Sequence, residues 1–249
     1  MNTWEDFERE AREVDKLTKD QSPDIVLLLQ DAIGLFADAF SIADNSDTTD
    51  ATMAKMSLLS QNFATLKCAV DLALRGYYSQ SMNLLRIVYE NWIAFHYLTK
   101  NPDEAHILLR DPNISNRLPD PAVMRKALGE DFNPLKEKIK QWYDVLCCFA
   151  HPHAAGVLPQ ITVNLISDET SIHYGTTYKD DFFRVSVYNI CIWTGVMLDA
   201  VGLWIPITNE WYKRRNKLEE RILRFIEEEN EISKSKESKS GGTEQNPTT

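Results

Sequence analysis

The chain has 249 residues, of which 43% are hydrophobic, and it carries a formal net charge of −10 with a pI near 5.0. This length is enough for one large or two small domains, and the composition is ordinary for a soluble globular protein. An acidic chain repels phosphate backbones, so non-specific nucleic-acid binding through a broad basic face is not expected. The one basic patch is YKRRNK at Tyr212–Lys217.

Cysteine usage and the N-terminus indicate a cytoplasmic protein. The four cysteines, Cys68, Cys147, Cys148 and Cys191, lack the spacing of a disulfide framework, which favours reduced thiols. The first residues, MNTWEDFEREAREVDK, are acidic and contain no apolar core of a secretory signal.

The first half of the chain predicts three long helices. Ser22-Pro23-Asp24 is typical of a helix start, and the apolar run that follows ends near DNSDTTD. A second helix is expected over Thr52–Arg75, ended by Gly76. A third is expected over Ser79–Thr99, because a residue before the proline of Asn101-Pro102 leaves the helical region.

The second half predicts three more helices and a small β-hairpin. Residues 101–134 contain five prolines and indicate a loop with two short helices. Helices are then expected from about Pro134 to Phe149, over Asp180–Trp204, and over Asn209–Asn230. The last has one apolar stripe, formed by Trp211, Leu218, Ile222 and Phe225.

Between these helices, ITVNLI, SDET and SIHYG predict a hairpin insertion near residues 161–175. Residues 233–249 offer no apolar side chain to bury and are expected to be a disordered tail. The predicted fold is therefore a mainly all-α multi-helix bundle, with a single domain over residues 1–232.

Polar residues form one stripe on the otherwise apolar third helix. Arg86 and Glu90 are four residues apart, so their side chains can meet, and His151, Tyr143 or the region of Asp71 could complete the group. The stripe also contains Ser79, Asn83 and Tyr97. It is either a buried hydrogen-bonded seam between helices or the lining of a binding or catalytic pocket.

The segment CCFAHPHA also allows two interpretations. His151 and His153 are either cap and loop residues after the helix that Pro152 ends, or functional residues that act as a general base or as a pair of ligands. The spacing is not that of a zinc site, and no pair of Glu-x-x-His motifs for a di-iron centre exists. Phosphate-binding glycine loops, a nucleophile elbow and a dinucleotide fingerprint are also absent, so no metal and no cofactor is predicted.

Two stretches carry a family resemblance, GYYSQSMNLLRIVYENWIAFHYL and YDVLCCFAHPHA. Over about Leu58–His173 the chain resembles a family of uncharacterised microbial helical proteins, a domain of unknown function. In that family an Arg-x-x-x-Glu helix precedes a helix that ends in an aromatic-Ser/Ala-His motif. The matching positions are Arg86, Glu90 and His151, and the resemblance implies a helical bundle with no established activity.

A looser similarity is to the HEPN group of helical, often dimeric proteins, many of them ribonucleases of defence systems. Their site pairs an arginine with a histidine four to six residues later on one helix. Here nine residues separate Arg86 from His96, which places them about 15 Å apart along the axis, too far for one compact site in a subunit. His96 is therefore interpreted as a core or interface residue.

These observations leave three functional interpretations. The leading one is a non-enzymatic binding or interaction protein that could form a homodimer through apolar helix faces. The seam of Arg86, Glu90 and His151 is then structural or lines a small pocket, and Asn83, Tyr97, Tyr143 and His153 are candidate binding residues. If the protein is an enzyme, Arg86, Glu90 and His151 are the candidate catalytic residues. The alternative is a HEPN-like ribonuclease or other phosphodiester hydrolase, with His151 as base and Arg86 on a phosphate. The third is a membrane-associated sensor in which Val187–Ile207 enters the membrane. Asn189 and Asp199 argue against it, because a carboxylate at the middle of a bilayer costs about 2.5–3.5 kcal/mol.

Overall fold

The computed structural model describes residues 3–42, 49–109, 117–128, 136–150, 161–164, 169–172, 176–204 and 208–240. The long helices are α1 (Trp4–Gln21), α2 (Pro23–Ile42), α3 (Asp50–Leu74), α4 (Tyr78–Lys100), α7 (Lys136–Ala150), α9 (Asp180–Trp204) and α10 (Asn209–Ser240). Short elements η1 (Pro102–Glu104), α5 (Ala105–Leu109) and α6 (Pro121–Ala127) follow α4. The helices form a mainly all-α bundle, as predicted.

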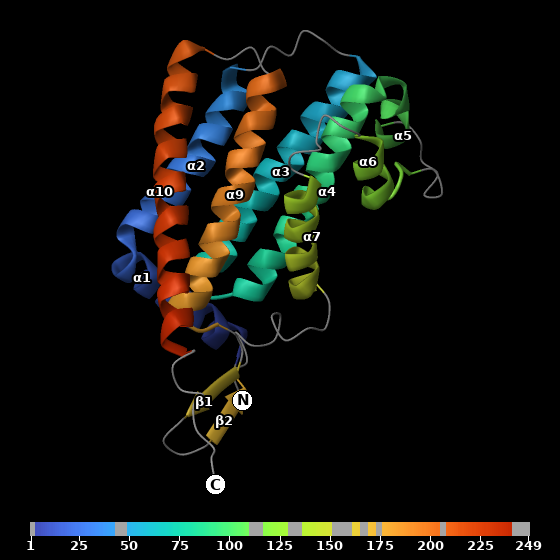
Figure 1. Ribbon diagram of the computed structural model, residues 1–249. Helices are drawn as coiled ribbons and strands as arrows, with labels where there is room; N and C mark the ends of the chain where they lie inside the picture. Colours follow the sequence, from blue (N-terminus) through green and yellow to red (C-terminus); the bar gives the residue numbers. More distant parts are fainter. Residues whose placement is uncertain are drawn as a thin grey trace.

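Helix α9 lies at the centre of the bundle. It packs against α2, α3, α4 and α10, while α3 and α4 form the most extensive pair and α7 and α6 cover the other side of α4 (Figure 1). Phe36, Leu59, Tyr89, Phe95 and Trp193 are among the large side chains in the core, each at most 1% exposed. The mostly apolar surfaces of α4 and α9 account for this arrangement, since a helix that is apolar all round must be enclosed by others.

The helix ends follow from local sequence. Thr3 and Asp6 form a reciprocal capping box at α1, with the Thr3 N–H donating to Asp6 Oδ2 at 2.9 Å. At the end of α3, the Tyr77 N–H donates to the Leu72 carbonyl and the Gly76 N–H to the Ala73 carbonyl, which is a Schellman motif. Gly76 has a φ of 81°, a conformation that glycine adopts without strain.

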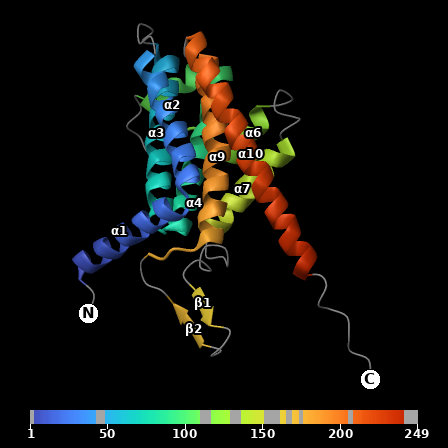
Figure 2. The same cartoon turned by 90° about the vertical axis from the view of Figure 1, so that its left-hand side faces the viewer.

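Two parts of the chain differ from the prediction. Helix α1 was not predicted, because its charged sequence has only a narrow apolar stripe, yet Ala11 and Thr18 on that stripe are buried. Helix α10 continues to Ser240, so the predicted disorder of residues 233–240 is wrong. Residues 241–249 lie outside the described residues. Both α1 and the end of α10 extend away from the bundle (Figure 2).

Two short strands lie between α7 and α9. Strands β1 (Ile161–Asn164) and β2 (Glu169–Ile172) pair antiparallel, with Ile161 opposite Ile172. They lie at one end of the bundle, apart from its helices (Figure 1). Of the segment expected to form a hairpin, these eight residues are the described part.

Two helices are apolar and long enough to cross a membrane by length and composition alone, Pro23–Ile42 and Asp180–Leu203. The bundle buries 39% of the apolar window in the first and 56% in the second. Core helices of soluble proteins pass the same test, so this property of the described residues is weak evidence for a membrane location.

Candidate functional site

The predicted pair on α4 is formed and is joined by a tyrosine from α7. Arg86 Nε donates to Glu90 Oε1 at 2.9 Å, and Arg86 Nη2 donates to the Tyr143 hydroxyl at 3.3 Å. The guanidinium carbon of Arg86 lies 5.6 Å from the centre of the Tyr143 ring. The Arg86 and Glu90 side chains are 29% and 33% exposed, so the expectation of a buried seam is corrected to a half-buried one that reaches the surface.

A second arginine, Arg125 on α6, approaches the same tyrosine. Its guanidinium carbon lies 5.7 Å from the centre of the Tyr143 ring, and its Nη1 donates to the Tyr89 hydroxyl at 2.7 Å. Sequence reasoning missed Arg125, because α6 lies in a proline-rich segment with no periodic pattern linking it to α4. We refer to Arg86, Tyr89, Glu90, Arg125 and Tyr143 as the two-arginine cluster.

Aromatic rings support the two-arginine cluster from the core side. Tyr89 and Tyr143 lie 4.8 Å apart between ring centres, and the edge-to-face contact of Tyr89 with Trp193 measures 5.5 Å. Trp142 and Trp92 also contact Trp193, at 5.9 and 6.1 Å. Such contacts add about 0.5–1.5 kcal/mol each beyond burial and fix ring positions, so the phenol groups are held in place.

Burial, hydrogen bonds and neighbouring charges shift the pKa values of the two tyrosines and of Arg86 in the cluster. Burial raises the pKa of Tyr143, and contact with Cys147 raises it further. Burial also raises the pKa of Tyr89, although the hydrogen bond from Arg125 opposes this. The hydrogen bond to Glu90 raises the pKa of Arg86. At neutral pH both tyrosines are therefore neutral, and the arginine is charged.

The other predicted polar residues that the structure describes are not part of the two-arginine cluster. Ser79 is buried, and Asn83 has a buried side-chain oxygen with no hydrogen-bond partner in the structure as described. The Tyr97 hydroxyl donates to Glu104 Oε1 at 2.9 Å, so Tyr97 ties α4 to η1 and is not part of the cluster. His151 and His153 lie outside the described residues, and their predicted roles stay predictions.

His96 lies among aromatic rings and not in the two-arginine cluster. It makes edge-to-face contacts with Trp92 and Phe95, at 4.9 and 5.3 Å between ring centres. Burial lowers the pKa of His96 to about 4, so the imidazole is neutral at pH 7.

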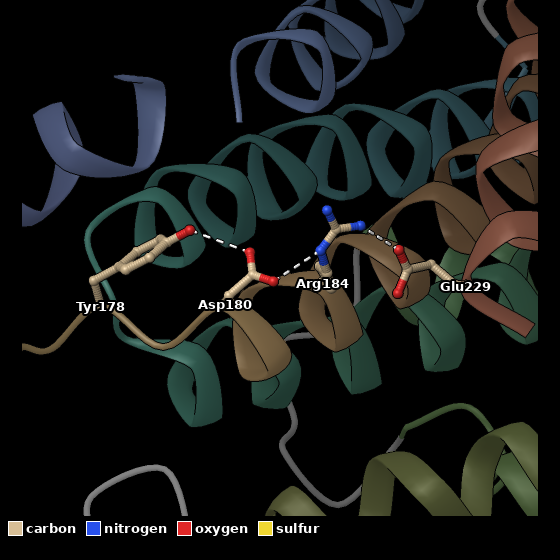
Figure 3. Close-up of polar contacts among 4 residues, drawn as sticks. All are labelled: Tyr178, Asp180, Arg184 and Glu229. Atoms are coloured by element: carbon tan, nitrogen blue, oxygen red, sulfur yellow. Dashed lines mark hydrogen bonds and ion pairs between the residues drawn. The ribbon is translucent and has the colours of Figure 1, made fainter. Parts of the chain in front are cut away.

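A second polar network lies where the chain enters α9. Arg184 Nε donates to Asp180 at 3.0 Å and Arg184 Nη1 donates to Glu229 at 2.5 Å, while the Tyr178 hydroxyl donates to Asp180 at 3.1 Å (Figure 3). The Glu229 side chain is only 13% exposed. This network joins α9 to α10, and each charge in it has an opposite partner, which indicates a structural role.

Comparison of the chain with models of known protein families, with curated proteins and with solved structures found no match. The family resemblances therefore stay expectations from sequence. Among the residues that the structure describes, no group of three or more His, Cys, Asp or Glu side chains could hold a metal ion. The two-arginine cluster is therefore the candidate functional site.

Proposed function

We propose that the protein is a binding protein whose α4–α6–α7 face recognises an anionic group. The observation that carries this proposal is the convergence of Arg86 and Arg125, from two different helices, on Tyr143. A guanidinium group binds carboxylate and phosphate oxygens through two parallel N–H donors, which a point charge such as lysine does not do.

The charge balance of the cluster supports this proposal. It contains two guanidinium groups and one carboxylate, that of Glu90, within a chain of net charge −10. In the described part of the chain Arg125 forms no ion pair, although the side chain is half-buried. A partly desolvated cation favours the approach of an anion.

Binding can be tested with inorganic phosphate and with acetate as probes, in titration calorimetry at low ionic strength. We expect saturable binding that Arg125→Ala weakens about tenfold, the loss of one charge-assisted contact of about 1.4 kcal/mol. Arg117→Ala is the matched control, because Arg117 precedes the same helix but is 76% exposed and pairs with Asp120. No saturable binding, or equal weakening in both variants, would contradict the proposal.

A ribonuclease is the second candidate, because the same two guanidinium groups beside an aromatic ring suit a phosphate and a stacked base. In this proposal Arg86 stabilises the phosphate and His151 acts as the base. The test is incubation of the purified protein with single-stranded RNA, together with Arg86→Ala and His151→Ala. Absence of cleavage by the unaltered protein would eliminate this candidate and leave the binding proposal intact.

A further inference from the structure

A small groove lies between α9 and α10, on helices that do not contribute to the two-arginine cluster. Its volume is about 130 Å³, and Leu198, Leu223 and Ile226 are among its apolar walls. The helices run antiparallel, because Asp199 pairs with Arg215 near one end and Arg184 with Glu229 near the other. The charged residues that line the groove, Asp199, Arg215 and Glu219, lie at the end near the Asp199–Arg215 pair.

Gly195 lies in this groove, in the middle of α9. Glycine in a helix interior lowers helix stability relative to alanine, so it usually marks a close approach of another backbone. Here a Cβ atom built on Gly195 would meet nothing within 4 Å. Helix packing does not explain the glycine, and its effect on the structure is to widen the groove.

The charged end of the groove carries an excess negative charge. Arg215 pairs with both Asp199 and Glu219, the latter at 3.3 Å, so one guanidinium faces two carboxylates. Neither carboxylate has another ion-pair partner in the described ranges, and their side chains are 57% and 48% exposed. The pKa of Asp199 is raised by partial burial and by the Glu219 charge, against the opposing effect of Arg215. A second cation can therefore approach both carboxylates and neutralise the excess negative charge.

We propose that this groove binds a short primary alkylammonium ion, with its carbon chain along the apolar walls and its ammonium group between Asp199 and Glu219. The volume is close to that of an apolar cavity of about 150 Å³, which can hold a benzene molecule, so a chain of four or five carbons fits. Three ammonium donors suit two carboxylates, while the apolar walls exclude a strongly hydrated small cation. The shared chemistry fits both a free amine and a lysine side chain.

The proposal is tested by titrating n-pentylammonium, 1-pentanol and pentanoate, which share one chain length and differ in charge. We expect pentylammonium to bind at least ten times more tightly than either of the other two. Gly195→Leu should fill the groove and abolish this binding, and Asp199→Asn should weaken it about tenfold.

The matched control is Gly34→Leu. Gly34 is also a helical glycine whose added Cβ would meet nothing within 4 Å, but it lies on α2, in a pocket formed with other residues of α10. Both leucine variants should keep the helical circular dichroism spectrum, and only Gly195→Leu should lose the ligand. Equal affinities for the three probes, or pentylammonium binding unchanged by Gly195→Leu, would overturn the proposal.

The two sources of the ammonium group are separated by one more probe, Nα-acetyl-lysine amide. Tighter binding of this probe than of pentylammonium would assign the groove to a lysine side chain of a partner. Tighter binding of pentylammonium would assign it to a free amine. Either result supports the proposal, provided that the Gly195→Leu variant no longer binds the probe.

Discussion

At the scale of single residues, exposure determines how much each polar contact contributes. Arg86 and Glu90 keep about a third of their side-chain surface in water, so their charges are only partly desolvated. Asn62 is the opposite case, because it is fully buried and its amide donates to the Val88 carbonyl and accepts from Asn91 at 2.9 Å. A fully buried polar group must be satisfied, whereas a half-exposed one can exchange partners with water or a ligand.

Arg86→Ala should lower the free energy of unfolding by about 1 kcal/mol, which corresponds to a fall of roughly 2–4 °C in Tm for a chain of this size. A fully buried pair would instead cost about 3–5 kcal/mol. Lys67→Ala is the control, because Lys67 and Asp71 are also four residues apart on one helix. Lys67 Nζ lies 2.6 Å from Asp71 Oδ2, and both side chains are about half exposed. Thermal melts of both variants test this. A loss above 3 kcal/mol for Arg86→Ala would show that the pair is desolvated in solution.

His96 should make the protein less stable in mild acid. Burial depresses the pKa of His96 to about 4 in the folded state, against about 6.5 in the unfolded chain. As pH falls through 6.5, the unfolded state takes up a proton that the folded state excludes, so stability is lost between pH 6.5 and 4. The loss from pH 7 to pH 5 should be about 2 kcal/mol.

Urea unfolding at pH 7 and pH 5 measures this effect, with His96→Phe as the comparison. Phenylalanine keeps the ring contacts and cannot titrate, so the variant should lack about 2 kcal/mol of the pH dependence. If both proteins lose the same stability on acidification, the imidazole is not held neutral.

At the scale of elements, the ends of the helices decide how the bundle connects. The turn after α3 depends on Gly76, and residues 176–179 pack against the same turn. The Lys179 N–H donates to the Tyr78 hydroxyl at 3.1 Å, and burial raises the pKa of Tyr78 to about 12. A Cβ on Gly76 would lie 2.5 Å from the Thr177 carbonyl oxygen. This contact joins the start of α4 to the segment that leads into α9.

Gly76→Ala should therefore destabilise the protein by more than the 1–3 kcal/mol that a left-handed backbone costs a non-glycine residue, because the backbone of Thr177 must also move. Gly34→Ala should have the opposite sign. Its new Cβ meets nothing within 4 Å in the middle of α2, and alanine gains up to about 1 kcal/mol of helix propensity. Thermal melts of both variants measure these changes. Equal shifts in Tm for the two variants would count against this account of the turn.

At the scale of the whole molecule, α10 is held by ion pairs on two sides. Arg214 and Arg221 pair with Asp38 and Asp31 of α2, at 2.7 and 2.5 Å, while Arg215 pairs with Asp199 of α9. Its apolar stripe, Trp211, Leu218, Ile222 and Phe225, is buried as predicted. Beyond Asn230 the side chains that the structure describes, those of residues 231, 232, 234 and 235, are exposed, so packing of these residues adds little to the stability of the helix.

Removing residues 233–249 should reduce the far-ultraviolet helical signal by the equivalent of about eight residues, while Tm changes little, because the side chains described beyond Asn230 are exposed. Circular dichroism of the full chain and the shortened chain measures both quantities. An unchanged helical signal would show that this segment is not helical in solution. A large fall in Tm would reveal contacts of the tail with the bundle.

Cell fractionation without detergent tests the membrane-associated alternative. We expect the protein in the soluble fraction, because α9 is enclosed by four other helices and 56% of its apolar window is buried. Retention in the membrane fraction after a high-salt wash would favour the sensor interpretation.

The sequence by itself determined the helical class, most helix bounds and the Arg86–Glu90 contact. These features depend on apolar periodicity, prolines, glycines and the i, i+4 spacing, all of which act within a few turns of chain. It did not predict α1, whose narrow stripe gains stability only when α2 and α3 cover it. It also placed the end of α10 too early, because a polar composition without apolar residues resembles disorder.

Only the tertiary structure decided which distant residues meet. Arg125 is 36 residues from Tyr89 along the chain, and no local pattern specifies their hydrogen bond. The same holds for the groove beside Gly195, which exists because two antiparallel helices leave space between them. Local spacing fixes neighbours on one helix, whereas the meeting of side chains from different helices depends on how whole apolar surfaces pack.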